Sequence, residues 1–221
     1  MFYSIAIDGP AGAGKSTIAK KIAKELEFIY VDTGAMYRAM ALYFIRNQVD
    51  VKNEDAINAA CKKIDVKIVY ENEMQQVLLN GENVTGLLRE EEVGNMASKT
   101  SSYKMVRQTL LGLQRDLAKT ANILMDGRDI GTHVLPNADL KIYLTASSAV
   151  RAKRRYDELL EKGESANLDQ IEEDIKQRDH QDMSRKIAPL KQAEDAVLVD
   201  SSHMGIDEVV AKVVEEFEKV K

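Results

Sequence analysis

The sequence predicts an α/β protein in which helices cover a parallel sheet. Short apolar runs typical of buried strands alternate with stretches whose apolar residues recur at helical spacing. Such alternation favours parallel strands joined by helices. The chain has 221 residues, of which 44% are hydrophobic and 30% charged. These values fit one globular core with a small inserted lobe better than two independent domains.

The chain begins with a strand, a glycine-rich loop and a helix, and then repeats the strand and the helix. Ser4–Asp8 is predicted to be a short buried strand, and Gly9–Gly14 a loop. Helical spacing follows over Lys15–Leu26. Ile29–Asp32 is the next apolar run, and a helix is predicted over Met36–Arg46.

The pattern changes between about residues 50 and 86. Val66–Tyr70 alternates in polarity, Glu71–Glu73 can turn, and Gln76–Leu79 brings the chain back before an Asn80-Gly81 turn signal. The simplest interpretation is a small antiparallel sheet inserted into the parallel fold.

The remaining elements return the chain to the core. In chain order we predict helices over Glu91–Ser98 and Lys104–Ala118, strands over Ile123–Asp126 and Leu140–Leu144, a helical hairpin over Ser148–Gln177, a strand over Ala196–Asp200 and a helix over Ile206–Val220. Gly163 separates the two halves of the hairpin, which is rich in Arg, Lys and Glu.

Composition narrows the choice of partners. The formal net charge of −5 argues against a polyanion-binding surface. Cys61 is the only cysteine, so an internal disulfide and a zinc-ligand pattern are both excluded. The first residues lead directly into a strand, with no charged and apolar leader and no membrane span. We therefore expect a cytoplasmic monomer that binds neither nucleic acid nor membrane.

A phosphate-binding loop carries the strongest signal. The segment from Gly9 to Ser16 matches G-x-x-x-x-G-K-[ST], with a predicted strand before it and a helix after it. Its backbone N–H groups can cradle phosphates, Lys15 can reach the β- and γ-phosphates, and the Ser16 hydroxyl can bind Mg²⁺. The residues expected to bind ATP are Gly9, Pro10, Ala11, Gly12, Ala13, Gly14, Lys15, Ser16 and Thr17. The motif alone does not separate a kinase from an ATPase or a GTPase, although the N/T-K-x-D tetrapeptide of GTPases does not occur.

Arginines beside two other strand ends indicate a second phosphate-bearing ligand. Arg38 follows the second strand and Arg128 follows the strand that ends at Asp126. Loops at the carboxyl ends of parallel strands face one crevice, so both guanidinium groups can clamp a phosphate there. Arg38 equally fits a solvated helix position. Asp126 fits a carboxylate near Mg²⁺ and, as well, a cap for the following turn.

Four ordered motifs give the chain a specific resemblance. GPAGAGKST, DTGAMYR, DGRDIGT and the late segment RDHQDMSR together resemble the bacterial cytidylate kinase family over essentially the whole chain. The resemblance implies a three-layer P-loop nucleoside monophosphate kinase fold, with a five-stranded parallel sheet, helices on both faces, an antiparallel insert and a short helical lid. It places the core at 1–35, 106–150 and 186–221, the acceptor-binding insert at about 36–105 and the lid at about 151–185.

The resemblance also assigns the acceptor residues. It implies that Arg38, Arg128 and Arg185 hold the acceptor phosphate, that Thr33 contributes a hydroxyl contact, that Arg178 and Asp182 lie near the ribose, and that Ser98, Arg107 and Asp129 bind the base. The base assignment agrees with cytosine chemistry. An arginine can donate to O2 and N3, while a carboxylate accepts from the N4 amino group. Uracil would present a carbonyl to Asp129, which costs about 1–3 kcal/mol in a dry site.

The resulting expectation is transfer of the γ-phosphate of MgATP to CMP or dCMP, with Lys15, Arg128 and Arg38 as the catalytic cations. The second pKa of an acceptor phosphate is about 6, so no general base is needed at neutral pH. Arg151 or Arg155 of the hairpin can close over the transferred group, although a solvated basic helix face explains them equally well. The alternatives are another small acceptor, such as UMP, AMP or shikimate, and a nucleotide-gated switch.

Overall fold

A five-stranded parallel sheet forms the centre of the protein. The computed structural model describes residues 2–72 and 74–221. The sheet contains β1 (Ser4–Asp8), β2 (Ile29–Asp32), β6 (Ile123–Gly127), β7 (Leu140–Thr145) and β8 (Val197–Asp200), in the order β2-β6-β1-β7-β8. All of its pairings are parallel, which confirms the predicted sheet.

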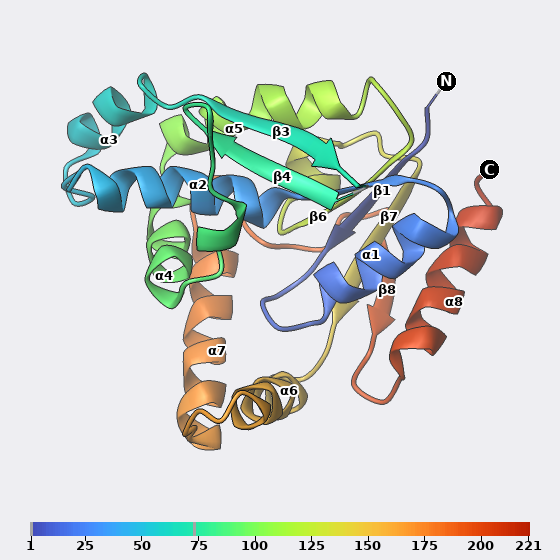
Figure 1. Ribbon diagram of the computed structural model, residues 1–221. Coiled ribbons are helices and arrows are strands. Elements are labelled where there is room, and N and C mark those ends of the chain that lie inside the picture. The colour runs from blue at the N-terminus through green and yellow to red at the C-terminus, as the bar shows by residue number, and fades with distance from the viewer. Residues whose placement is uncertain (1, 73) are drawn as a thin grey trace.

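Helices cover both faces of this sheet (Figure 1). They are α1 (Lys15–Glu25) and α8 (Ile206–Glu218) on one face, and α2 (Thr33–Arg46) and α5 (Lys104–Leu117) on the other. Because successive strand residues point to opposite faces, β1 divides its side chains between two cores. Ile5 and Ile7 pack with α1 and α8, whereas Ala6 packs with α2 and α5. None of the helices in the described ranges is long and apolar enough to cross a membrane.

The inserted lobe contains the predicted antiparallel sheet, and also one α-helix and one short 3-10 helix that the sequence analysis did not predict. Its strands are β3 (Val66–Glu71), β4 (Met74–Leu79) and β5 (Glu82–Asn83). Asn80 and Gly81 both have positive φ, as a tight hairpin turn requires. Glu73 of the first predicted turn lies outside the described residues. The insert also contains α3 (Glu54–Cys61), η1 (Thr85–Leu87) and α4 (Glu91–Thr100).

Helix α3 was missed because its signal is short. Only eight residues are helical, and apolar side chains are buried at Ile57, Ala60 and Cys61. The Asn53 side chain starts the helix by accepting hydrogen bonds from the backbone of Asp55 and Ala56. A short amphipathic helix that a cap defines is easily absorbed into a predicted loop.

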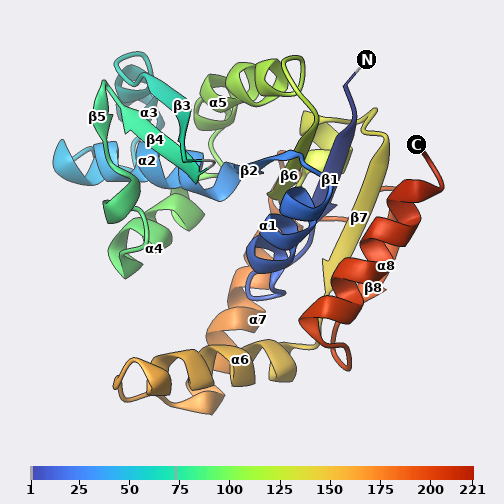
Figure 2. The same ribbon diagram turned by 45° about the vertical axis from the view of Figure 1, so that its right-hand side comes forward.

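The helical hairpin extends further than predicted. It consists of α6 (Ser148–Glu161) and α7 (Leu168–Ser184), separated by Gly163 with φ 78°. Figure 2 shows the two helices lying together beyond the end of β7. The prediction that the hairpin ends at Gln177 was wrong. Helix α7 continues because no Pro or Gly interrupts it before Ser184, and it therefore carries Arg178 and Asp182.

Helix α2 also begins earlier than predicted, at Thr33 and not at Met36. The carboxylate of Asp32 accepts a hydrogen bond from the backbone N–H of Ala35 at 3.0 Å and so caps the helix. The DTGAMYR segment is therefore a strand end and a helix start with no loop between them, and Thr33 is held at the edge of the sheet. A helical turn of a different kind, the π-turn η2 (Ile130–Val134), follows β6.

Candidate functional site

A large cavity lies at the carboxyl ends of the parallel strands. The strand register pairs Asp126 with Asp32 on one side and with Ile7 on the other, so β2, β6 and β1 end at the same edge. Ligands of open parallel sheets bind at this edge. The cavity has a volume of about 690 Å³. The predicted site residues that line it are Ala11, Gly12, Gly14, Lys15, Ser16, Thr17, Thr33, Arg38, Ser98, Arg107, Asp126, Arg128, Asp129, Arg151, Arg155, Arg178, Asp182 and Arg185.

One end of the cavity is the glycine loop, here called the donor end (residues 9–17). A Cβ atom on Gly9 would lie 1.9 Å from the carbonyl oxygen of Leu144, so only glycine fits. Pro10 and Ala13 are buried, and Gly14 with φ 84° leads into α1. The N-terminus of α1 gives this end a favourable dipole for phosphate.

Lys15 is buried within this loop. Its Nζ donates a hydrogen bond to the Pro10 carbonyl at 2.7 Å, and only 6% of the residue is exposed. Burial lowers the pKa of the Lys15 ammonium well below its ordinary value, and the positive charge of Arg128 lowers it further. A cation destabilised in this way is stabilised strongly by an anionic ligand.

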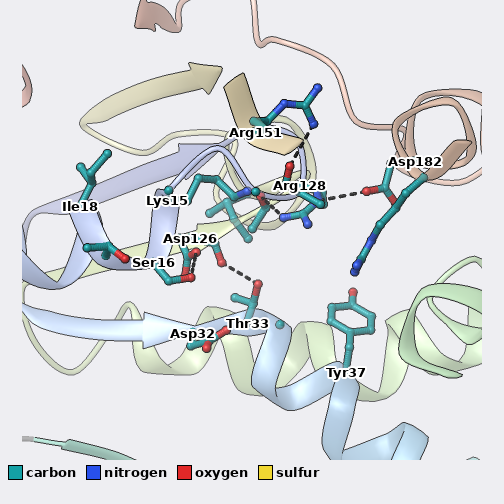
Figure 3. Close-up of a pocket in the computed structure, with 18 of the residues that line it drawn as sticks. Lys15, Ser16, Ile18, Asp32, Thr33, Tyr37, Asp126, Arg128, Arg151 and Asp182 are labelled. Atoms are coloured by element: carbon teal, nitrogen blue, oxygen red, sulfur yellow. Dashed lines mark hydrogen bonds and ion pairs between the residues drawn. The ribbon is translucent and has the colours of Figure 1, made fainter. Parts of the chain in front are cut away.

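Asp126 connects the glycine loop with β2 and α2. Its carboxylate accepts hydrogen bonds from Ser16 Oγ at 3.0 Å and from the Tyr30 hydroxyl at 2.9 Å. Its backbone carbonyl accepts one from Thr33 Oγ1 at 2.7 Å (Figure 3). Burial, together with the negative charge of Asp32, raises the pKa of Asp126 to about 6. The carboxylate is thus engaged by Ser16 and Tyr30 and does not cap the following turn.

The oxygen atoms around Asp126 fit a magnesium ion. A hydroxyl and a carboxylate lie within hydrogen-bonding distance, and both are hard oxygen donors of the kind that Mg²⁺ prefers. Within the described ranges, no cluster of three or more His, Cys, Asp or Glu side chains could hold a metal by itself.

The other end of the cavity, here called the acceptor end, contains a buried charge cluster. Arg107 of α5 donates to the Asp129 carboxylate in an ion pair whose partners are 5% and 4% exposed. Arg185 Nη2 lies 3.6 Å from the other oxygen of Asp129. The guanidinium of Arg107 also stands over the ring of Tyr37, 5.6 Å from its centroid. Residues far apart in the sequence therefore meet around one carboxylate.

A second set of arginines stands between the two ends. Arg128 Nε donates to the Asp182 carboxylate at 3.0 Å (Figure 3). Burial lowers the pKa values of Arg38 and Arg178. Nearby guanidinium groups, Arg89 for Arg38 and Arg128 for both, lower them further. The cluster thus holds positive charges that destabilise one another.

Several N–H donors of the arginines that line the cavity make no hydrogen bond to any described residue. Arg107 Nε, Arg178 Nε and Arg185 Nη2 are buried, and none has a hydrogen-bond partner in the described part of the chain. Buried N–H groups without partners are costly, and a ligand that accepts from them removes that cost. Crowded positive charge and unpaired donors together describe a site shaped for a phosphorylated, hydrogen-bonding ligand.

Ser98 and the hairpin arginines make other contacts. The Ser98 carbonyl accepts from Gln181 Nε2 at 3.3 Å, which links α4 to α7. Arg151 is buried, donates to the Ala11 carbonyl at 2.9 Å and forms an ion pair with Asp179 at 2.6 Å. Arg155 is about half exposed and pairs with Glu158 at 3.0 Å. Arg151 is thus part of the support of the glycine loop, whereas Arg155 stands at the rim.

The sequence analysis missed several residues that line the cavity, among them Tyr37, Arg89 and Gln114, and one residue beside it, Asp8. Asp8 accepts hydrogen bonds from the backbone of Ile130 and Gly131, each at 2.7 Å. Tyr37 lies under Arg107, and the buried Gln114 amide Nε2 faces the same end without a hydrogen-bond partner among the described residues. Asp8 carried a usable signal, because it ends an apolar strand as Asp126 does. Gln114 follows Arg107 by two helical turns on the same face of α5, a relation visible only once the helix is placed.

A glycine loop that cradles phosphates and a pocket crowded with arginines share one cavity, and this arrangement defines a P-loop phosphotransferase with two substrate ends. Comparisons with known proteins agree. The family model described as cytidylate kinase matches residues 5–219. A cytidylate kinase of Caldicellulosiruptor bescii is 49% identical over 217 residues, covering 98% of this chain and 96% of that protein. The chain belongs to the cytidylate kinase family.

Other relatives and a solved structure extend the comparison. A cytidylate kinase of Carboxydothermus hydrogenoformans is 47% identical over 211 residues, covering 96% of this chain and 95% of its own length. One of Bacillus cereus is 45% identical over 210 residues, covering 95% and 93%. The crystal structure of an uncharacterised Eubacterium ventriosum protein superposes with a TM-score of 0.54, covering 98% of both chains at 10% identity. At that identity, the structural likeness supports the fold alone.

Proposed function

We propose that this chain is a cytidylate kinase that transfers the γ-phosphate of ATP to CMP or dCMP, giving ADP and CDP or dCDP. The observation that carries the proposal is the joint cavity, in which the glycine loop and the buried Arg107–Asp129 pair face one space. Membership of the cytidylate kinase family supports the same reaction. We further propose that residues 36–105 are the acceptor-binding insert, that 151–185 are the lid and that the rest is the core.

The donor end binds the triphosphate. The loop residues 9–17 surround the phosphates with backbone N–H groups, and Lys15 neutralises the transferred group. Mg²⁺ would be held by Ser16 Oγ, with Asp126 directly or through water, and when bound it neutralises charge on the β- and γ-phosphates. Deprotonated Asp126 can bind the cation or its water. Its 3.0 Å hydrogen bond from Ser16 Oγ keeps the carboxylate oxygen and the hydroxyl oxygen close together.

The acceptor phosphate is bound by the arginines between the two ends. Arg38 and Arg128 are suited to this because a dianion relieves the repulsion between them, and Arg185 reaches the same phosphate from the acceptor end. Thr33 adds a hydroxyl, and Arg178 and Asp182, which line the same cavity, are the proposed contacts of the ribose. Within the described part of the chain Arg178 Nε has no hydrogen-bond partner, so it is available to donate to a ribose hydroxyl.

The base is recognised by Arg107 and Asp129. The guanidinium donates to O2 and N3 of cytosine, and the carboxylate accepts from N4. Arg107 already holds Asp129, so the two groups are oriented before the base arrives, and the Tyr37 ring supports Arg107 from beneath. Ser98 is the third candidate, although in this structure its recorded contacts involve its carbonyl.

No general base is needed for the transfer. The acceptor phosphate, with a second pKa of about 6, is already a nucleophile at neutral pH. Catalysis is then alignment of two phosphates and neutralisation of their charge by Lys15, Arg38 and Arg128. Of the two candidate hairpin arginines we favour Arg155 for contact with the transferred group when the hairpin closes. Arg151 is buried in contacts with Ala11 and Asp179, whereas the Arg155–Glu158 pair is exposed and can be exchanged.

The test is ADP formation from ATP with CMP, dCMP, UMP and AMP in turn, each over a range of concentrations. The proposal expects kcat/KM for CMP and dCMP to exceed that for UMP and AMP by at least about tenfold. Faster use of UMP or AMP would contradict the assignment of the base. ATP hydrolysis at the same rate with and without any monophosphate would instead support a nucleotide-gated switch.

A further inference from the structure

Asp8 holds the segment that carries Arg128 and Asp129. The residue ends β1 directly before the glycine loop and is 5% exposed. Its two carboxylate oxygens are used separately. Oδ1 accepts from Ile130 N and Oδ2 from Gly131 N, each at 2.7 Å. A carboxylate that accepts two backbone N–H groups at this distance forms strong, charge-assisted hydrogen bonds.

These two bonds replace a helix cap that would ordinarily be local. The π-turn η2 begins after Asp129, which occupies the N-cap position but makes no side-chain cap. An aspartate at an N-cap normally folds its carboxylate back onto the first N–H groups of the turn. Here Asp8 supplies that carboxylate from the neighbouring strand. The side chain of Asp129 is therefore free to turn toward Arg107 and Arg185.

We propose that Asp8 is a positioning residue for acceptor recognition: it caps η2 in place of Asp129 and so keeps the Asp129 carboxylate available to the acceptor base. The inference rests on the proposed function, since it takes Asp129 to be the group that reads the base. Asp8 itself touches neither substrate, because both of its oxygens are committed to the backbone of η2.

Loss of the Asp8 charge should therefore damage acceptor selectivity more than donor binding. In Asp8→Asn, one of the two oxygens becomes an NH₂ group that faces a backbone N–H, donor against donor. The N–H group of η2 that has lost its acceptor then competes with Arg107 for the Asp129 carboxylate. A merely structural role would lower the active fraction of the enzyme for every acceptor equally and leave the ratio of CMP to UMP use unchanged.

The experiment measures kcat and KM for CMP, UMP and ATP in wild type, Asp8→Asn, Asp129→Asn and the double variant. The expected result is a KM for CMP raised about tenfold or more in Asp8→Asn, with a similar fall in the CMP-to-UMP ratio of kcat/KM. The KM for ATP should change less than about threefold. When Asp129→Asn is already present, adding Asp8→Asn should lower the CMP-to-UMP ratio by less than about twofold more, because the two residues act through one contact.

Asp139→Asn is the matched control. The Asp139 carboxylate accepts from the backbone and the hydroxyl of Ser4 at 2.7 and 3.0 Å, at the opposite end of the same strand. Its loss should leave the CMP-to-UMP ratio unchanged. An unchanged ratio in folded Asp8→Asn, or losses that add fully in the double variant, would overturn the inference. A wild-type enzyme that does not prefer CMP would instead overturn the proposed function.

A second variant tests the same contact if Asp8→Asn does not fold. A Cβ on Gly131 would lie 3.1 Å from Lys141 Cδ and 3.5 Å from Asp8 Oδ2, so Gly131→Ala displaces η2 slightly while the carboxylate remains. We expect a fall of about threefold in the CMP-to-UMP ratio. A folded Gly131→Ala enzyme with wild-type selectivity would contradict the positioning role.

Discussion

The two ends of the cavity are built by different means. The donor end is nine consecutive residues, Gly9–Thr17, whose backbone shape is fixed by glycines and by the strand and helix that flank them. The acceptor end assembles side chains from α2, α5, α7 and the segment after β6, which no local motif contains. A site made of backbone depends on the conformation of one loop, whereas a site made of long side chains depends on how distant elements pack. The two ends should therefore fail in different ways.

The largest expected effect tests the donor end. Lys15→Ala removes the buried cation that we propose neutralises the transferred phosphate. We expect kcat to fall by on the order of 10³-fold or more, with the fold retained, because an ammonium whose pKa is lowered by burial contributes little to stability. Circular dichroism and steady-state kinetics measure the two properties. Lys24→Ala, at the exposed end of α1, is the control and should be active. Near wild-type turnover in Lys15→Ala would remove the loop from the mechanism.

A backbone change should also affect the donor end first. In Gly9→Ala the new Cβ would collide with the Leu144 carbonyl, 1.9 Å away, so the loop must move. A displacement of this size lowers kcat/KM for ATP by about 10²-fold. The matched control is Gly94→Ala within α4, where nothing lies within 4 Å of the added Cβ. There alanine should raise the unfolding free energy by about 0.5–1 kcal/mol. Equal loss of CMP and ATP affinity in Gly9→Ala would contradict the separation of the two ends.

Between the two ends, Asp8 should give stability a pH dependence. Burial raises the pKa of its carboxyl to about 6 from an ordinary 3.8, against the opposing effect of its two backbone hydrogen bonds. The folded protein therefore binds this proton more tightly than the unfolded chain does. The contribution of Asp8 to the unfolding free energy is present below pH 4 and is lost as the pH rises through about 6.

Urea denaturation at several pH values measures this contribution. The fall in unfolding free energy between pH 4 and pH 7 should be smaller in Asp8→Asn than in wild type, by on the order of 3 kcal/mol. The comparison uses slopes, so the loss of hydrogen bonds in the variant, which shifts its stability at every pH, does not affect it. Parallel profiles for the two proteins would show that the Asp8 carboxyl does not titrate differently on folding.

The same contrast explains what could be predicted from the sequence. The strands of the parallel sheet, the antiparallel insert and the glycine loop were predicted because each is recognised from residues that are close together in the chain. The positive φ angles at Asn80 and Gly81, for example, are properties of two adjacent residues. The first residue of α2, the last residue of α7 and the existence of α3 were not predicted, because helix caps and packing decide them.

The acceptor end could be predicted only through family resemblance. Nothing in the local sequence distinguishes Arg107 from other helix-surface arginines, yet it is buried against Asp129, 22 residues later. Asp8 shows the remaining difficulty. It was placed correctly at the end of a strand, but its partners Ile130 and Gly131 lie more than 120 residues away. Long-range hydrogen bonds of this kind follow from topology, which residue spacing does not contain.

The smallest expected effect is confined to the acceptor end. Asp129→Asn keeps a carbonyl that accepts from cytosine N4 but adds an NH₂ group that donates to uracil O4, and it leaves the buried Arg107 without its ionised partner. We expect kcat/KM for CMP to fall about ten- to hundredfold, kcat/KM for UMP to fall less or to rise, and the KM for ATP to stay within about twofold. Asp116→Asn, on the exposed face of α5, is the control and should match wild type for both acceptors. If the KM for ATP rose together with the KM for CMP, the two ends would not be independent. The side chains of the acceptor end would then be coupled to the backbone of the glycine loop. Because Asp8 stands between them, double variants with Asp8 would be the first test of that coupling.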